Sequence, residues 1–174
     1  MTSRQTLPLL WLLSDERNDA GLEDALAALP RGSGFVFRHY RLEESARRER
    51  FEVLASIARS HAHSVLLSRA SGWGEDGAYG SHRLSEGLWL ATAHNGEEIA
   101  RAAQSGADGI FLSPVFPTAS HPGAAHLGVH GFHVLAQQSP VPVIALGGMD
   151  YERANQLDWP RWGAIDGLVS TKSA

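Results

Sequence analysis

Cysteine is missing from all 174 positions of the chain. Its absence excludes a disulfide framework, a thiol nucleophile and any cysteine-based zinc or iron–sulfur site. No apolar run approaches the roughly 18 residues that a membrane-spanning helix needs. With a formal net charge of −4, the chain also lacks the basic excess of a nucleic-acid-binding surface. We therefore expect a cytoplasmic protein with neither a nucleic-acid partner nor a membrane partner.

The signature motifs of several enzyme classes are also missing. The sequence has no G-x-S-x-G nucleophile elbow, no Walker loop, no H-E-x-x-H metal motif and no G-x-G-x-x-G dinucleotide fingerprint. Nine histidines are present, but no carboxylate or cysteine joins His126, His130 and His133 to complete a metal site. These patterns predict no metal ion and no cofactor.

Short apolar runs alternate with longer amphipathic segments along the chain. This alternation predicts βαβ units and a parallel sheet. The expected strands are 9–13, 35–37, 65–67, 78–79, 88–91, 109–112, 141–146 and 165–169. The expected helices are 21–29, 43–62, 96–104, 128–138 and 150–157.

About eight strands in a single domain, residues 1–174, predict a (β/α)₈ barrel. The barrel is expected to be shortened, because full helices do not fit between Val65 and Trp89 and no eighth helix follows Ser170. An open doubly wound sheet is the alternative. An incomplete barrel would leave apolar surface to be covered, so we also expect a homodimer.

The residues that follow the strands are the candidates for function, because parallel α/β folds carry their sites there. Gly147 and Gly148 follow the strand 141–146, where their backbone N–H groups could meet a phosphate or simply form a tight turn. Ser170 and Thr171 add hydroxyl groups after the last expected strand. Together these four residues predict a phosphate subsite.

Two further residues at strand ends carry chemistry. Arg38 could bind an anion in a bidentate manner, or it could begin a solvated loop. His94 could take and return a proton near neutral pH, or it could be an ordinary polar residue beside the helix cap Asn95. The residues alone leave both pairs of alternatives open.

One stretch resembles a known family. Residues 106–120, GADGIFLSPVFPTAS, are similar to the GADYIxxGPVFPTxTK segment of the thiamine phosphate synthase/TenI family. The pattern continues in register through Pro122, Leu127-Gly128 and residues 142–149, and it is fainter in the N-terminal half. This resemblance implies a (β/α)₈ barrel and a place in thiamine biosynthesis.

The family contains two chemistries, and departures from the pattern favour one of them. The synthase joins a pyrimidine diphosphate to a thiazole phosphate with Mg²⁺, whereas TenI-type members tautomerise a thiazole carboxylate phosphate without metal. Ser68-Arg69 stand where the synthase pattern has an Asn-Asp pair, and residues 80–84 lack its second metal carboxylate. Tyr40 and His121 replace two lysines that should hold pyrophosphate. The metal site of the synthase is therefore severely weakened.

The resemblance also implies roles for individual residues. His94 falls on the histidine of the TenI SVHS segment, which implies that it is the acid/base. Gly147, Gly148 and the hydroxyls of Ser170 and Thr171 match the thiazole-phosphate cradle. The residues expected to bind the rest of the substrate are Arg38, Arg69, Thr92, Ser113, Val115, Phe116, Thr118 and Ser120.

The sequence thus predicts a TenI-like protein that binds a small phosphorylated thiazole and isomerises it through His94. One alternative is a divergent Mg²⁺-dependent synthase whose carboxylates come from elsewhere, such as Asp15, Glu75 or Asp76. Only this alternative calls for Mg²⁺. Another alternative is a non-catalytic member that binds the thiazole phosphate without turnover.

Overall fold

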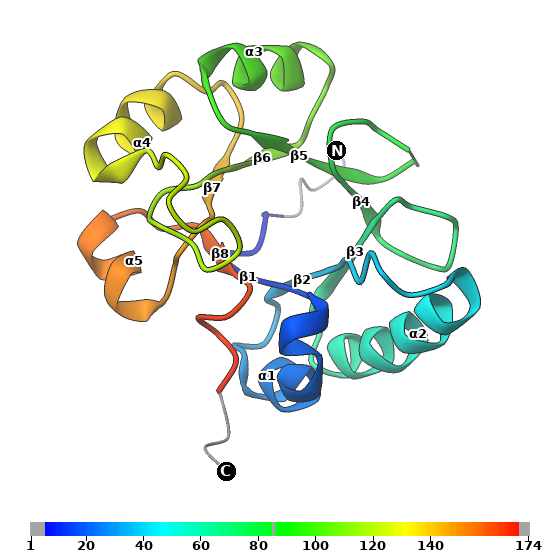
Figure 1. Cartoon of the computed structure of the whole chain (residues 1–174). Helices are drawn as coiled ribbons and strands as arrows, with labels where there is room; N and C mark the ends of the chain where they lie inside the picture. Colours follow the sequence, from blue (N-terminus) through cyan, green and yellow to red (C-terminus); the bar gives the residue numbers. More distant parts are fainter. Residues whose placement is uncertain (1–5, 85, 171–174) are drawn as a thin grey trace.

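Eight parallel strands close into one barrel (Figure 1). The computed structural model describes residues 6–84 and 86–170. The strands are Leu10–Leu13 (β1), Gly34–Phe37 (β2), Ser64–Ser68 (β3), Gly77–Tyr79 (β4), Leu88–Ala93 (β5), Gly109–Leu112 (β6), Val143–Ala145 (β7) and Trp162–Ala164 (β8). Because β8 pairs with β1, the predicted (β/α)₈ barrel is confirmed and the alternative of an open sheet is wrong.

The helices lie outside the barrel and begin close to where the sequence predicts them. In the described residues they are the 3₁₀-helix η1 (Glu16–Gly21) and the α-helices α1 (Leu22–Ala28), α2 (Glu44–Ser60), α3 (Gly96–Gln104), α4 (Gly128–Gln137) and α5 (Tyr151–Leu157). Asn95 and Asp150 cap α3 and α5, because each side chain accepts a hydrogen bond from a backbone N–H of the first turn. Over the part of the chain that the structure describes, no helix has the length and apolar character needed to cross a bilayer.

Between β3 and β5 the described chain forms loops instead of helices, which confirms the predicted shortening (Figure 1). Two tryptophans pack on the outside of these strands, where helices would otherwise lie. The Trp73 ring lies 5.7 Å from the Phe51 ring and 5.3 Å from the guanidinium carbon of Arg47. The Trp89 ring is buried, and the guanidinium carbon of Arg83 lies 5.7 Å from it. Aromatic side chains thus replace the missing helices as the cover of these strands.

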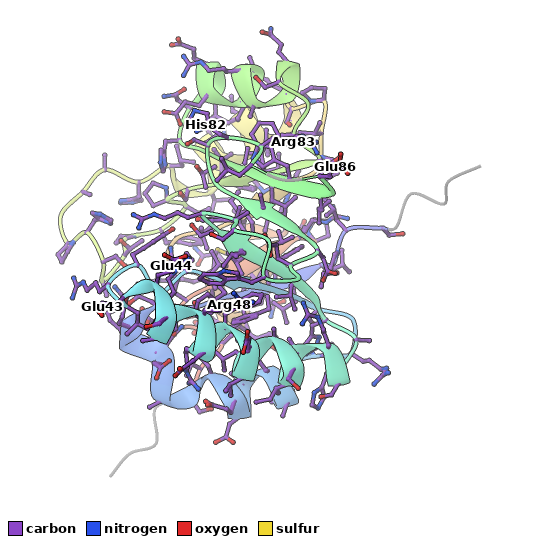
Figure 2. All side chains as sticks on the ribbon, turned by 90° about the vertical axis from the view of Figure 1, so that its right-hand side faces the viewer. Glu43, Glu44, Arg48, His82, Arg83 and Glu86 are labelled. Atoms are coloured by element: carbon purple, nitrogen blue, oxygen red, sulfur yellow. The ribbon has the colours of Figure 1, made fainter. Side chains whose placement is uncertain are left out.

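This side of the barrel also carries charged side chains. Figure 2 looks onto it and labels Glu44 and Arg48 on α2, Glu43 directly before that helix, and His82, Arg83 and Glu86 on the loop between β4 and β5. Charged side chains thus lie on the side of the barrel where we expected an apolar surface. The homodimer itself stays a prediction.

Alternation along each strand divides the core into an inner and an outer layer. Trp11 belongs to the inner cluster, whereas its neighbour Leu12 belongs to the outer one. The Trp11 ring lies 5.8 Å from that of Phe111 on β6, which is not a neighbouring strand, so the contact crosses the barrel interior. Space for the indole comes from Gly34 and Gly163, since a Cβ at Gly34 would lie 2.2 Å from a ring carbon.

The prediction of the last strand is wrong. Residues 165–169 form a loop, and the strand is β8, Trp162–Ala164. Closure of the barrel selects these residues: the backbone N–H of Trp162 donates to the Leu9 carbonyl at 2.9 Å, and Gly163 fits against Trp11. The residues that directly follow the last strand are therefore Ile165 and Asp166.

Candidate functional site

A cavity of about 1050 Å³ opens at the carboxyl ends of the strands. Each of the eight strands contributes lining residues from its last positions or from the loop that follows it. The predicted site residues that line the cavity are Arg38, Thr92, His94, Ser113, Thr118, Ser120, Gly147 and Gly148.

Other predicted residues lie elsewhere. Val115 and Phe116 are buried in the outer core rather than exposed to the cavity. Arg69 is exposed and does not line the cavity, and Ser170 is also outside it, because β8 ends six residues earlier at Ala164. Thr171 falls outside the described residues.

Hydrogen bonds fix the tautomer of His94. Its Nδ1 lies 2.8 Å from the carbonyl oxygen of Ser113 at the end of β6. Since a carbonyl oxygen only accepts hydrogen bonds, Nδ1 carries the proton and Nε2 is the acceptor nitrogen of the neutral ring. The backbone N–H of His94 donates to the Glu98 carboxylate at 2.7 Å, which ties the residue to α3. His94 lines the cavity, so Nε2 of the neutral ring is an acceptor at the cavity wall.

Gly147 and Gly148 make a turn that only glycine adopts without strain, because both have positive φ, 103° and 64°. The loop after β6 packs directly on this turn: the Phe116 N–H donates to the Gly147 carbonyl at 3.1 Å, and a Cβ at Gly147 would lie 2.6 Å from the Cα of Pro114. Val115 and Phe116 thus support the glycine turn from behind.

The backbone N–H groups of the two glycines have no hydrogen-bond acceptor among the described residues. Both glycines line the cavity, so these groups are available to a bound anion. The tight turn and the phosphate subsite, which the sequence left as alternatives, are therefore compatible.

Sequence reasoning missed Arg153, which lies beside this turn. Its Nη1 donates to the Gly148 carbonyl at 2.6 Å, and its guanidinium carbon lies 5.2 Å from the Phe116 ring. Arg153 lines the cavity from the first turn of α5. The available signal was its position five residues after Gly148, on a helix that starts at the carboxyl end of a strand.

Arg38 lies on the β2 side of the cavity and is held by Ser14. Its backbone N–H donates to Ser14 Oγ at 2.7 Å, its Nε donates to the Ser14 carbonyl at 2.8 Å, and its Nη2 lies 3.4 Å from Asp15. Behind Ser14, buried His39 contacts Ser14 Oγ at 2.9 Å and Asp19 at 2.6 Å. Ser14 itself is buried, so this Asp–His–Ser row orients Arg38 and does not offer a nucleophile.

Aromatic and cationic groups continue beyond Arg38. The Tyr40 hydroxyl lies 3.0 Å from Ser68 Oγ, and the Arg69 guanidinium carbon lies 4.9 Å from the Tyr40 ring. Burial raises the pKa of the Tyr79 hydroxyl at the cavity floor, so this group stays neutral near pH 7. Tyr40 and Arg69 thus lie against one another beside the cavity. In the synthase pattern a lysine and an aspartate stand at these two positions.

Arg17, also missed from the sequence, crosses the mouth of the cavity. Its Nη1 donates to Ser120 Oγ at 2.8 Å, and its Nη2 lies 3.1 Å from Asp166. These contacts join the loops that follow β1, β6 and β8. No local pattern could reveal them, because the partners are 103 and 149 residues away along the chain.

The carboxylates considered as substitute metal ligands do not gather at the cavity. Glu75 accepts hydrogen bonds from the N–H groups of Gly72 and Trp73, and Asp76 accepts one from the N–H of Val65 near the start of β3. Glu75 and Asp76 thus lie at the amino ends of the strands, opposite the cavity. Asp15 does line the cavity, but Arg38 and Arg17 contact it. Within the described ranges no three His, Asp or Glu side chains cluster as a metal site.

Part of the chain resembles a known family in sequence. Residues 81–159 match the TMP-TENI family model, described as thiamine monophosphate synthase. A thiamine-phosphate synthase of Chloroflexus aurantiacus is 37% identical over 79 residues, which cover 45% of this chain and 35% of that protein. A putative thiamine-phosphate synthase 2 of Aquifex aeolicus is 40% identical over 62 residues, covering 36% and 33%. The matched segments thus span about a third of these relatives, and they support a relationship to this family.

The fold has similar solved structures over most of its length. Thiamine phosphate pyrophosphorylase from Pyrococcus furiosus superposes with a TM-score of 0.75 at 19% identity, covering 90% of this chain and 84% of that one. FabK from Thermotoga maritima superposes with a TM-score of 0.66 at 13% identity, covering 92% and 58%. At these identities the superpositions show a shared barrel fold.

Proposed function

We propose that this chain is a TenI-like member of the thiamine phosphate synthase/TenI family that binds a thiazole phosphate and shifts a proton within it. The segment matched by the family model contains His94, Ser113 and the Gly147–Gly148 turn. These residues meet at one cavity at the carboxyl ends of the strands, where barrel enzymes carry their sites.

The observation that carries the proposal is the state of His94. The Ser113 carbonyl holds the proton on Nδ1, so Nε2 is free to accept one from a ligand. We infer that Nε2 removes a proton from the thiazole carboxylate phosphate and returns it at the other end of the conjugated system. The electron pair moves through the ring, and nothing is gained or lost, so the isomerisation needs no co-reactant.

The remaining lining residues would position the ligand around His94. The free N–H groups of Gly147 and Gly148 would bind the phosphate. Arg38, whose guanidinium is fixed by Ser14, would meet the carboxylate. Thr92, Ser113, Thr118 and Ser120 would supply hydroxyl groups along the wall.

Residues at the expected Mg²⁺ site do not fit a magnesium ion, which prefers carboxylate and phosphate oxygens. Ser68 lies against the Tyr40 hydroxyl, and the Arg69 guanidinium stacks on the same tyrosine. Asp15, the nearest candidate carboxylate, is paired with Arg38 and Arg17. The proposed proton shift therefore involves no metal ion.

Replacement of the base tests the proposal. We expect His94→Asn to lower the rate of tautomer conversion by about 10²–10⁴-fold, as for loss of a general base, while leaving affinity for the ligand within a few-fold. Ring-proton NMR signals of the thiazole carboxylate phosphate would report conversion. His61→Asn is a matched control, since His61 lies at the C-terminal end of α2 and does not line the cavity.

An unchanged rate in His94→Asn would contradict the assignment of His94. Saturable binding without conversion by the native chain would instead indicate the non-catalytic member considered from the sequence.

The names of the relatives favour a second candidate, the synthase. It predicts that the chain releases pyrophosphate from a pyrimidine diphosphate and a thiazole phosphate, and that EDTA stops the release. A coupled pyrophosphate assay with and without Mg²⁺ separates this candidate from the tautomerase.

A further inference from the structure

A phosphate at the Gly147–Gly148 turn would meet more negative charge than the sequence suggests. Ser170 does not line the cavity, so the hydroxyl donor expected on the neighbouring loop is not there. In its place the loop after β8 brings Asp166 to the wall, and Asp150 lies beside the glycines. A phosphate monoester carries nearly two negative charges at neutral pH. The two backbone N–H groups alone would leave this charge without a neutralising cation.

Three arginines line the cavity in the described residues, and they differ in their partners. Arg17 lies within ion-pair distance of Asp15 and Asp166, and Arg38 of Asp15. Arg153 has no carboxylate within that distance in the described chain, although it is half-buried. Its charge is therefore the one that a bound anion would neutralise.

The guanidinium of Arg153 is also held in place. Nη1 is fixed by the Gly148 carbonyl and the Phe116 ring lies beside the group, while Nε and Nη2 have no acceptor in the described part of the chain. The Asp150 carboxylate binds the backbone N–H of Arg153 instead of its side chain. That contact already uses the backbone N–H at the start of α5. The group left to donate to a bound phosphate is therefore the Arg153 side chain and not the helix terminus.

Resting on the proposed function, we propose that Arg153 supplies the cation of the phosphate subsite and makes the cavity selective for phosphorylated over unphosphorylated thiazoles. The glycine N–H groups and the fixed guanidinium together form the cradle. Arg153 is thus a binding residue that sets specificity, and it lies beside Gly148 and the Phe116 ring.

Isothermal titration with two probes tests this assignment. Hydroxyethylthiazole phosphate and its alcohol differ only in the phosphate group. For Arg153→Gln we expect about 10- to 100-fold weaker binding of the phosphate ester, the range for a lost hydrogen bond to a charged group, and unchanged binding of the alcohol. Arg153→Lys, which keeps the charge but not the planar fork, should fall between.

Arg101→Gln is the matched control, because Arg101 is an exposed arginine of α3 paired only with Glu97 in the described residues. Equal losses for the ester and the alcohol would overturn the proposal, since they would indicate a merely structural role beside Gly148. Equal affinity of Arg153→Gln and the native chain for the ester would overturn it as well.

Inorganic phosphate, followed by ³¹P NMR line broadening, separates this proposal from the proposed function. Broadening with the native chain but not with Arg153→Gln, together with no binding of either thiazole, would retain the anion subsite and reject the thiazole ligand. Absence of broadening with the native chain and of ester binding would reject the subsite.

Discussion

His94 and Arg153 each have one nitrogen anchored to a backbone carbonyl, Ser113 in one case and Gly148 in the other. Anchoring removes the rotational freedom of the side chain and leaves the remaining nitrogens for a ligand. The sequence placed His94 correctly at a strand end, but its tautomer depends on a carbonyl 19 residues away. Chemistry at the residue scale is therefore decided by contacts that only the fold reveals.

The glycine turn gives a prediction at the same scale. Gly147→Ala combines a positive φ with a Cβ 2.6 Å from the Pro114 Cα, so we expect a loss of about 2–4 kcal/mol in the free energy of unfolding. Gly32→Ala is the control: its φ is 81° but nothing lies within 4 Å of the added Cβ, so it should lose about 1 kcal/mol. Urea denaturation measures both, and equal losses would contradict the role of packing at Gly147.

Among the elements, α2 is linked to η1 and α1 through charged groups. Arg50 on α2 binds Asp19 in η1 at 2.7 Å and also pairs with Glu23 in α1. Burial alone would raise the pKa of Asp19, but hydrogen bonds from Arg50 and His39 outweigh it and lower the pKa. The hydrogen bond from Arg50 likewise lowers the pKa of Glu23. Both carboxylates are therefore more stable as ions in the folded chain.

Replacement of Arg50 should make stability less dependent on pH. Groups whose folded pKa is lowered stabilise the fold above their unfolded pKa, near 4, and lose this effect as pH falls through the folded pKa. Because the carboxylates are partly exposed, we expect Arg50→Met to cost only about 1 kcal/mol at pH 7, with the difference from the native chain shrinking below about pH 4.

Arg48→Met is the control for this pair, since Arg48 and Glu52 form an exposed pair within α2 and should contribute less. Unfolding free energies measured from pH 7 to pH 3 give the comparison. A difference between Arg50→Met and the native chain that stays constant with pH would contradict the argument.

Most elements were predictable because local patterns specify them. The continuous apolar runs of β1 and β6 match strands buried on both faces, and the caps Asn95 and Asp150 mark the starts of α3 and α5. The exception is β8, whose Trp-Gly-Ala sequence is selected by pairing with β1 and by the space around Trp11. Because the last strand was predicted too late in the sequence, Ser170, whose hydroxyl we expected to bind the phosphate, lies outside the cavity.

On the scale of the whole molecule, closure of the barrel is what makes one site from residues spread along the chain. Strand ends from every part of the sequence meet at one cavity, so Arg17, Arg38, His94 and Arg153 face a common space. The loops and tryptophans between β3 and β5 show that a barrel can close without a complete ring of helices (Figure 1). Residue type and strand position predicted much of this lining, whereas the pairing of Arg17 across the mouth required the closed fold.

The function that we propose is an isomerisation of a thiazole phosphate that needs no metal. Its most direct test is to incubate the native chain with the thiazole carboxylate phosphate in EDTA and to follow the ring-proton NMR signals. We expect conversion above the uncatalysed rate, unchanged when Mg²⁺ replaces EDTA. No conversion in EDTA, with pyrophosphate release from a pyrimidine diphosphate and a thiazole phosphate once Mg²⁺ is added, would contradict it and establish a synthase in its place.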